Sequence, residues 1–219
     1  MYKLNILLLQ DLNSIPNRKS FILSALNATS LAHRISCDVR LDTQFYFFWL
    51  DGILSRLITF KGNRVPGRIL LNHMLLNFSK KKISVDIIGT LNNNSLNFLN
   101  SINLKFNYID VPISDAKSIA EIASKEIKFS NVILLLPSPK QEQVSEFLII
   151  KKPAKYYCFG GALNMLSGNE NPAPSFVVFL GIEFLWRLQN DTLRRIFRFF
   201  WIIQHIFKFK RERFICRYY

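Results

Sequence analysis

The middle of the chain alternates between short apolar runs and amphipathic segments. Runs rich in Val, Ile, Leu and Tyr predict strands, and apolar residues spaced three or four apart predict helices. The predicted strands are 84–89, 105–111, 131–136 and 155–159, and the predicted helices are 95–102, 115–129 and 140–150. Ser114 or Asp115 should cap the helix over 115–129. Because strands and helices alternate, we expect an α/β fold with a Rossmann-like open parallel sheet and flanking helices.

The first 60 residues follow a less regular pattern. We expect a helical stretch over residues 21–31, a charged segment over 34–42 and a helix over 53–60. An apolar run over 45–50 leads directly into Asp51. A carboxylate in such a place is either paired with a cation or available as a base, while a turn or cap Asp before a glycine is the common alternative.

The last part of the chain combines basic residues with a dense apolar face. From residue 194 to 214, Arg and Lys alternate with large aliphatic and aromatic side chains. One helical face is formed by Ile196, Phe199, Phe200, Ile203 and Phe207. A core helix, a helix in a membrane interface and a nucleic-acid-binding segment are three interpretations. We favour the membrane interface, because it explains the basic flanks and the aromatic rings together.

The composition indicates a globular protein with an anionic partner. A length of 219 residues suits one domain with an appendage, and a hydrophobic fraction of 49% excludes a disordered chain. The 29 basic and 15 acidic side chains give a net charge of +14, and half of this charge lies in residues 187–219. We expect no membrane span and no secretory signal. The three cysteines lack zinc-site spacing and are expected to be reduced cytoplasmic thiols.

Open parallel sheets bind ligands where the carboxyl ends of their strands meet. Here these ends carry Gly89, Pro112, the segment 137–139 and the pair Gly160-Gly161. A nucleotide or a sugar nucleotide is the expected ligand, although the chain contains neither GxGxxG nor GxxxxGK[ST]. The α/β pattern alone does not select a chemistry.

Short motifs follow one another along the whole chain. They are LNATSL at 26–31, LDG at 50–52, RVPGR at 64–68, LPSPKQE at 136–142, GGA at 160–162, Gly168, AP at 173–174 and GIEFLWRL at 181–188. In this order and at these separations they resemble the WecG/TagA/CpsF family of bacterial glycosyltransferases, glycosyltransferase family 26. The most specific part of the resemblance is the PKQE element at 139–142 followed by GIEFLWRL at 181–188, which we call the GLEW-like block.

The sequence departs from the family pattern at a few positions. Asn164 stands where the family usually has Asp, and Pro172 where it usually has Arg. Thr192 replaces the Pro of a Glu-Pro pair, and Ala25 replaces a frequent Thr. These changes concern substrate details rather than the fold.

The resemblance implies an inverting glycosyltransferase of cell-surface polysaccharide synthesis, such as capsule, exopolysaccharide, O-antigen or teichoic acid linkage. It would move a sugar from a UDP-sugar to a polyprenyl-diphosphate-linked sugar acceptor. An N-acetylmannosamine-type donor or another hexose, such as glucose, both fit. Asp51 matches the proposed family base, which removes the proton of the attacking hydroxyl. No cofactor is implied, and we expect no metal because the chain contains no Asp-x-Asp.

Without a metal, cations must meet the phosphates of the donor. Arginine suits this task because its planar guanidinium donates two hydrogen bonds and keeps its charge when desolvated. By spacing from the GLEW-like block, Arg187, Arg194 and Arg198 match the family's C-terminal arginines.

Other residues are expected to bind substrate. Gln141, at the start of a helix, either donates to substrate oxygens or is an exposed cap residue. Glu183 is expected among these residues, and its carboxylate is expected to pair with an arginine such as Arg187 one helical turn away rather than to act as a second base. The resemblance and the strand ends add Asn27, Arg64, Gly89, Gly160 and Gly161. His33, His73 and His205 match no motif and are treated as structural or surface residues.

We expect residues 1–186 to form the glycosyltransferase domain, with an N-terminal part over 1–80 and a β/α core over 81–186. Residues 187–219 should form a basic, amphipathic, helical appendage that associates with the membrane. The expected partners are the UDP-sugar, the lipid-linked acceptor and an anionic membrane surface, with no nucleic acid. Whether the protein forms a homo-oligomer is left open by the sequence. The expected location is cytoplasmic, peripheral on the inner face of the cell membrane. A noncatalytic basic α/β module that binds a membrane or RNA is the alternative from another class.

Overall fold

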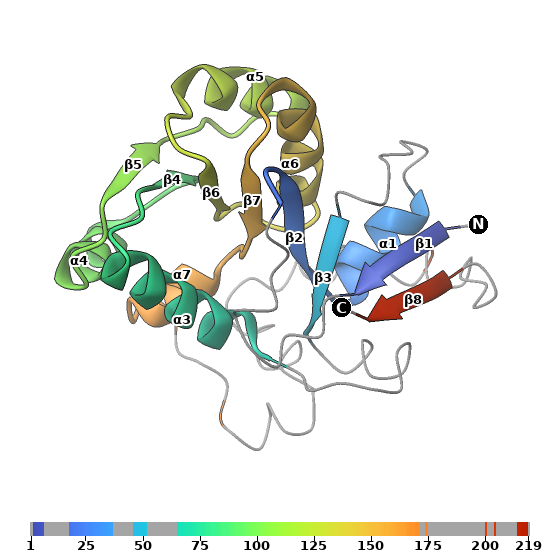
Figure 1. The fold of residues 1–219 in the computed structure, drawn as a ribbon, viewed down its shortest axis with the longest axis horizontal. Helices are drawn as coiled ribbons and strands as arrows, with labels where there is room; N and C mark the ends of the chain where they lie inside the picture. The colour runs from blue at the N-terminus through green and yellow to red at the C-terminus, as the bar shows by residue number, and fades with distance from the viewer. Residues whose placement is uncertain are drawn as a thin grey trace.

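The computed structural model describes residues 2–6, 18–36, 46–51, 65–170, 174, 200, 204 and 214–218. Within these residues, eight parallel strands form one sheet in the order β5-β4-β6-β7-β2-β3-β1-β8, with helices on both faces (Figure 1). The strands are β1 (Tyr2–Ile6), β2 (Phe21–Leu26), β3 (Tyr46–Leu50), β4 (Val85–Ile88), β5 (Phe106–Ile109), β6 (Asn131–Leu134), β7 (Lys155–Cys158) and β8 (Phe214–Tyr218). The helices are α1 (Ala28–Ser36), α3 (Gly67–Lys80), α4 (Asn93–Ser101), α5 (Ala116–Glu126), α6 (Lys140–Lys151) and α7 (Ala162–Leu166). The predicted open α/β sheet is confirmed.

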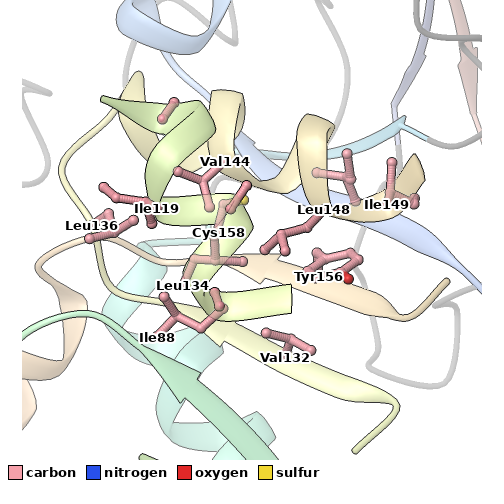
Figure 2. Packing of buried hydrophobic residues seen from close by; sticks show 14 of the residues in the cluster. Ile88, Ile119, Val132, Leu134, Leu136, Val144, Leu148, Ile149, Tyr156 and Cys158 are labelled. Carbon is pink, nitrogen blue, oxygen red and sulfur yellow. The ribbon is translucent and has the colours of Figure 1, made fainter. Parts of the chain in front are cut away.

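The two faces of the sheet bury separate hydrophobic cores. One core packs the sheet against α5 and α6, and the other packs it against α3 and α7 (Figure 1). Figure 2 shows the first core, where Val144 and Leu148 of α6 meet side chains of β6 and β7. Burial on both faces explains why the strands read as continuous apolar runs.

The middle of the chain matches the pattern-based prediction closely. The four strands and three helices predicted there correspond to β4 to β7 and to α4 to α6, with all four strands somewhat shorter than expected. Asp115 is the N-cap of α5, and its carboxylate accepts hydrogen bonds from the backbone N–H groups of Lys117 and Ser118. These bonds, with a stronger one from the Ser118 hydroxyl, lower the pKa of Asp115 to about 2.

The helical stretch predicted over residues 21–31 is wrong in its first half. Residues 21–26 form the central strand β2, and the helix α1 begins only at Ala28. Successive side chains of β2 alternate between the two cores, with Ile22 in one and Leu23 in the other. A short run that is apolar on both faces gives no clear period, so the sequence could not separate strand from helix here. The long helix α3 has no counterpart among the predicted elements.

The C-terminal appendage is described only in part. Phe200 and Gln204 are helical and exposed, whereas Phe214–Tyr218 form β8, which pairs in parallel with β1. The expected helical appendage therefore ends in a strand that belongs to the main sheet. The helix predicted over 53–60 and most of the basic aromatic segment lie outside the described residues. Among the described residues, none forms a helix with the length and apolar character that a membrane crossing requires.

A buried aspartate ties three segments together next to the sheet. Asp86 of β4 is fully buried and accepts hydrogen bonds from the Asn107 side chain at 2.7 Å and from the backbone N–H of Phe129 at 2.6 Å. The backbone N–H of Lys128 lies within 3.2 Å of both carboxylate oxygens. Each oxygen of Asp86 therefore faces donors only.

We predict that Asp86→Asn destabilises the protein by about 2 to 3 kcal/mol, because the new NH₂ group must face an N–H donor whichever way the amide turns. The measurement is the midpoint of urea unfolding. Asp110→Asn is the control, since among the described residues the exposed Asp110 accepts from the Tyr108 hydroxyl alone, and an amide oxygen can replace that acceptor. Equal midpoints for the two variants would contradict the role given to Asp86.

Candidate active site

The carboxyl ends of five neighbouring strands lie side by side, and a predicted site residue follows each of these strands. Ile88, Leu134, Cys158, Ser24 and Phe48 are successive register partners across β4, β6, β7, β2 and β3. The segments that follow these residues therefore leave the sheet along one edge. This edge carries six of the predicted residues, namely Asn27, Asp51, Gly89, Gln141, Gly160 and Gly161.

Asn27 and Asp51 lie next to each other at this edge. Leu26 of β2 and Leu50 of β3 are register partners, and the backbone N–H of Asp51 donates to the carbonyl of Leu26 at 3.4 Å. The Asn27 side-chain oxygen accepts from the backbone N–H groups of Thr29 and Ser30, each at 3.0 Å. Asn27 thus caps α1 and fixes the direction in which the chain leaves β2.

The half-buried Asp51 faces the start of α3. The backbone N–H of Val65 donates to the carbonyl of Leu50 at 3.0 Å, which brings the segment 65–67 beside the end of β3. A Cβ placed on Gly67 would lie 3.9 Å from Asp51 Oδ2 and 3.6 Å from the Trp49 ring. Two motifs that are separate in the sequence, LDG and the VPG part of RVPGR, therefore meet at the carboxylate of Asp51.

Gln141 is not the exposed cap residue that the sequence left open, because it is only 4% exposed. Its side-chain oxygen accepts from the backbone N–H of Gly160 at 2.8 Å, and its side-chain nitrogen donates to Glu142 Oε1 at 3.0 Å. Ser24 of β2 also donates to this oxygen, at 2.8 Å. The side chain of Gln141 therefore joins the start of α6 to the glycine turn after β7.

A second buried polar group lies one turn further along α6. Glu146 Oε1 lies 3.4 Å from His33 Nε2 and 3.3 Å from an Arg34 guanidinium nitrogen. The guanidinium of Arg34 stacks over the ring of Tyr46, 4.8 Å from its centroid. Burial, with Glu146 nearby, raises the pKa of the Tyr46 hydroxyl well above its ordinary value. His33 is therefore structural, as expected, and His73 is exposed.

Gly89 has a structural reason to be glycine. Its φ angle is 142°, in a region that residues with a Cβ rarely adopt, and an added Cβ would lie 3.2 Å from the backbone of Leu135. Gly89 directly follows β4, where the order of the strands reverses, since β5 lies on one side of β4 and β6 on the other. The substrate contact predicted for Gly89 stays a prediction beside this packing role.

A neutral polar network joins the segments after β4 and α7. The Asn169 side chain donates to Asn92 at 2.8 Å and to Ser167 at 2.6 Å, and it accepts from Asn94 at 2.9 Å. Asn92 is the N-cap of α4. Amide and hydroxyl groups can bind uncharged polar ligands such as sugars, but here they mainly bond one another.

Several predicted residues lie outside the described part of the chain. They are Arg64, Glu183, Arg187, Arg194 and Arg198. In the described ranges, no three His, Cys, Asp or Glu side chains form a group that could hold a metal ion. Cys158 is a free, buried cysteine, and burial raises the pKa of its thiol well above its ordinary value, which makes it a poor nucleophile.

Sequence reasoning missed the buried partners of Gln141. Glu142 was visible as the last residue of the PKQE motif, but nothing in the sequence showed that it points inward at Ser24.

The exposed part of the edge offers a half-buried carboxylate, a capping amide and a glycine turn. Such a set can accept a proton from a hydroxyl and bind a polar ligand through backbone groups.

Comparison with known proteins adds the chemical class. No curated protein sequence gives a significant match to the chain. A family model described as the glycosyl transferase WecG/TagA/CpsF family matches residues 53–216. The matched segment includes PKQE, the glycine pair and the GLEW-like block, whereas Asn27 and Asp51 precede it. The chain belongs to the WecG/TagA/CpsF family of glycosyltransferases, which act in cell-surface polysaccharide synthesis.

Proposed function

We propose that the protein transfers a sugar from a UDP-sugar to the sugar of a polyprenyl-diphosphate-linked acceptor, with inversion at the anomeric carbon. The observation that carries the proposal is the family match over residues 53–216, together with the carboxylate of Asp51 beside Asn27 and Gly67 at the ligand-binding edge of the sheet. The donor would be of the N-acetylmannosamine type or a related hexose.

Asp51 is the proposed base of a single displacement. The acceptor hydroxyl attacks the anomeric carbon, its proton passes to the Asp51 carboxylate, and the bond from that carbon to the UDP oxygen breaks with its electron pair on UDP. One carboxylate is sufficient because UDP is already a good leaving group. Asp51 has the half-buried position that such a base needs, since it must meet substrate without being fully solvated.

The diphosphate needs positive charge as it leaves. We assign this role to Arg187, Arg194 and Arg198, whose guanidinium groups can each donate two hydrogen bonds to phosphate oxygens. Because no Asp-x-Asp occurs in the chain, we propose that these arginines replace a divalent metal. No organic cofactor is needed for this reaction.

The same C-terminal region is proposed to hold the enzyme on the inner face of the cell membrane. Its net positive charge would attract anionic lipid headgroups, and the aromatic face would settle at the acyl boundary. The exposed helical residue Phe200, 59% accessible, belongs to this face. Such attachment places the enzyme where a polyprenyl-linked acceptor is found.

The substrate class is tested by incubating the protein with a panel of UDP-sugars and polyprenyl-diphosphate-linked GlcNAc, followed by mass spectrometry. We expect one donor to add the mass of one sugar to the acceptor. The same reaction in EDTA should change rate by less than about twofold, because no carboxylate cluster is proposed to hold a metal. Activity that returns only with Mg²⁺ or Mn²⁺ would contradict the metal-free mechanism.

We predict that Asp51→Asn leaves the fold intact and lowers kcat by roughly two to four orders of magnitude, the usual loss when a general base is removed. The single-turnover rate with the donor found above is the measurement. Glu126→Gln serves as the control, since this exposed carboxylate is the last residue of α5, near the start of β6 and away from the carboxyl ends of the strands. A folded Asp51→Asn protein with near-normal kcat would remove Asp51 from the mechanism and favour a noncatalytic binding module.

For the tail, point substitutions are better than truncation, because β8 is part of the sheet and truncation would remove it. Replacing Lys208, Lys210, Arg211 and Arg213 by Gln should weaken liposome binding at low salt, since each cation contributes about 1 kcal/mol near an anionic surface. Turnover of a short, water-soluble acceptor should be preserved.

The matched variants Arg194→Ala and Arg198→Ala should keep liposome binding. They should lose turnover with the polyprenyl-diphosphate-linked acceptor and with the water-soluble acceptor. Full activity of both arginine variants on the soluble acceptor would show that the tail acts only as an anchor.

A further inference from the structure

Three side chains form a buried chain of hydrogen bonds that ends on the backbone of the candidate site. The Ser24 hydroxyl and the Gln141 amide nitrogen both donate to Glu142 Oε1, at 2.8 and 3.0 Å. The Gln141 amide oxygen then accepts from the Gly160 backbone N–H at 2.8 Å. The chain starts in the central strand β2, passes through the first turn of α6 and reaches the turn after β7.

The order of donors and acceptors fixes the orientation of the Gln141 amide. Gly160 offers an N–H, so the side-chain oxygen of Gln141 must face it and the nitrogen must face the other way. Glu142 Oε1 supplies the acceptor that this nitrogen needs, and the Ser24 hydroxyl holds that oxygen in place. If the amide turned over, Gly160 would face a second donor and lose its bond.

Gly160 depends on this bond for its position. It has a φ of 56°, and a Cβ added there would lie 3.5 Å from the carbonyl of Leu136 and 3.8 Å from both amide atoms of Gln141. Its N–H has a second, longer contact of 3.3 Å with the carbonyl of Leu134. The turn is thus held between the end of β6 and the Gln141 side chain, and Gly161, the exposed residue of the turn, follows directly.

Glu142 itself does not reach a ligand. It is only 1% exposed, and its second oxygen, Oε2, is buried without a hydrogen-bond partner among the described residues. Burying a carboxyl group with one oxygen unpartnered lowers the stability of the fold. An apolar side chain avoids this cost, as the buried Val144 on the same helix does. A group retained at this cost is expected to serve positioning.

We propose that Glu142 is a positioning residue: through Gln141 it sets the Gly160-Gly161 turn in the conformation that meets the donor substrate, with Ser24 as its support. The first half of this proposal concerns the protein alone. The second half, contact of the turn with the donor, rests on the proposed function.

The first half is tested by selective ¹⁵N-glycine labelling, which gives a simple amide spectrum because the chain has only eight glycines. The Gly160 signal is identified by its loss in Gly160→Ala. In Ser24→Ala and in Glu142→Met, which removes the acceptor oxygen, we expect this signal to shift and its hydrogen exchange to accelerate by about tenfold, because the bond to Gln141 is loosened. Ser24→Ala is the milder change and covers the case in which Glu142→Met does not fold.

Ser145→Ala is the matched control. Ser145 is also a fully buried serine, but its hydroxyl donates to the backbone carbonyl of Glu142 and not to the carboxyl group. It should leave the Gly160 signal in place. An unchanged Gly160 signal in both Ser24→Ala and Glu142→Met would overturn the proposal.

The second half is tested by steady-state kinetics with the donor and acceptor varied separately. Ser24→Ala and Glu142→Met should raise KM for the donor by about tenfold and leave KM for the acceptor unchanged, since only the donor meets the turn. A purely structural loss would lower the active fraction and leave both KM values as they were. A moved Gly160 signal with an unchanged donor KM would overturn the donor contact. If the unaltered protein transferred no sugar, the proposed function would fail, and the spectra would still decide whether Glu142 positions the turn.

Discussion

The parallel pairing of the strands is the constraint on which the site depends. Strands that run in one direction place all their carboxyl ends along one edge, so residues from distant parts of the chain meet there without any special contact. The register is set by apolar side chains that alternate between two cores, as Ile22 and Leu23 do in β2. A slip by one residue would exchange the two cores, which makes the relative position of Asn27 and Asp51 a consequence of core packing.

Polar contacts between helices on one face of the sheet fix the relative position of these helices more precisely than apolar packing does. The helix α1 begins after Asn27 and α6 begins near Gln141, so each helix starts at a residue of the candidate site. Glu146 of α6 contacts His33 and Arg34 of α1, in surroundings from which water is largely excluded. Because the three groups interact only in one relative placement of the helices, this contact sets the spacing of their two N-terminal ends.

The secondary structure could be predicted from the sequence where the hydrophobic periodicity and the helix-capping residues indicate the same elements. The elements from 84 to 159 were predicted in the right order, and Asp115 was one of two residues proposed for the cap that it forms. Prediction failed at β2, because a central strand buried on both faces has no polar side to reveal its period. Motifs located Asp51, Gln141 and the glycine pair along the chain. They could not show that Gln141 turns inward, since its partners are the backbone of Gly160 in the next turn and Glu142, which is itself held by Ser24 more than a hundred residues earlier.

The pairing of β1 with β8 has a consequence for how the molecule is made. Tyr2 is the register partner of Phe214, so the two strands meet across almost the full length of the chain. Contacts between such distant segments close large loops and form slowly. During synthesis β1 is made before β8, and the side of β1 on which β8 pairs stays open until residues 214–218 have emerged. The backbone groups of an unpaired outer strand can pair with another chain. The interval before β8 is made is therefore the stage at which this protein is most exposed to aggregation.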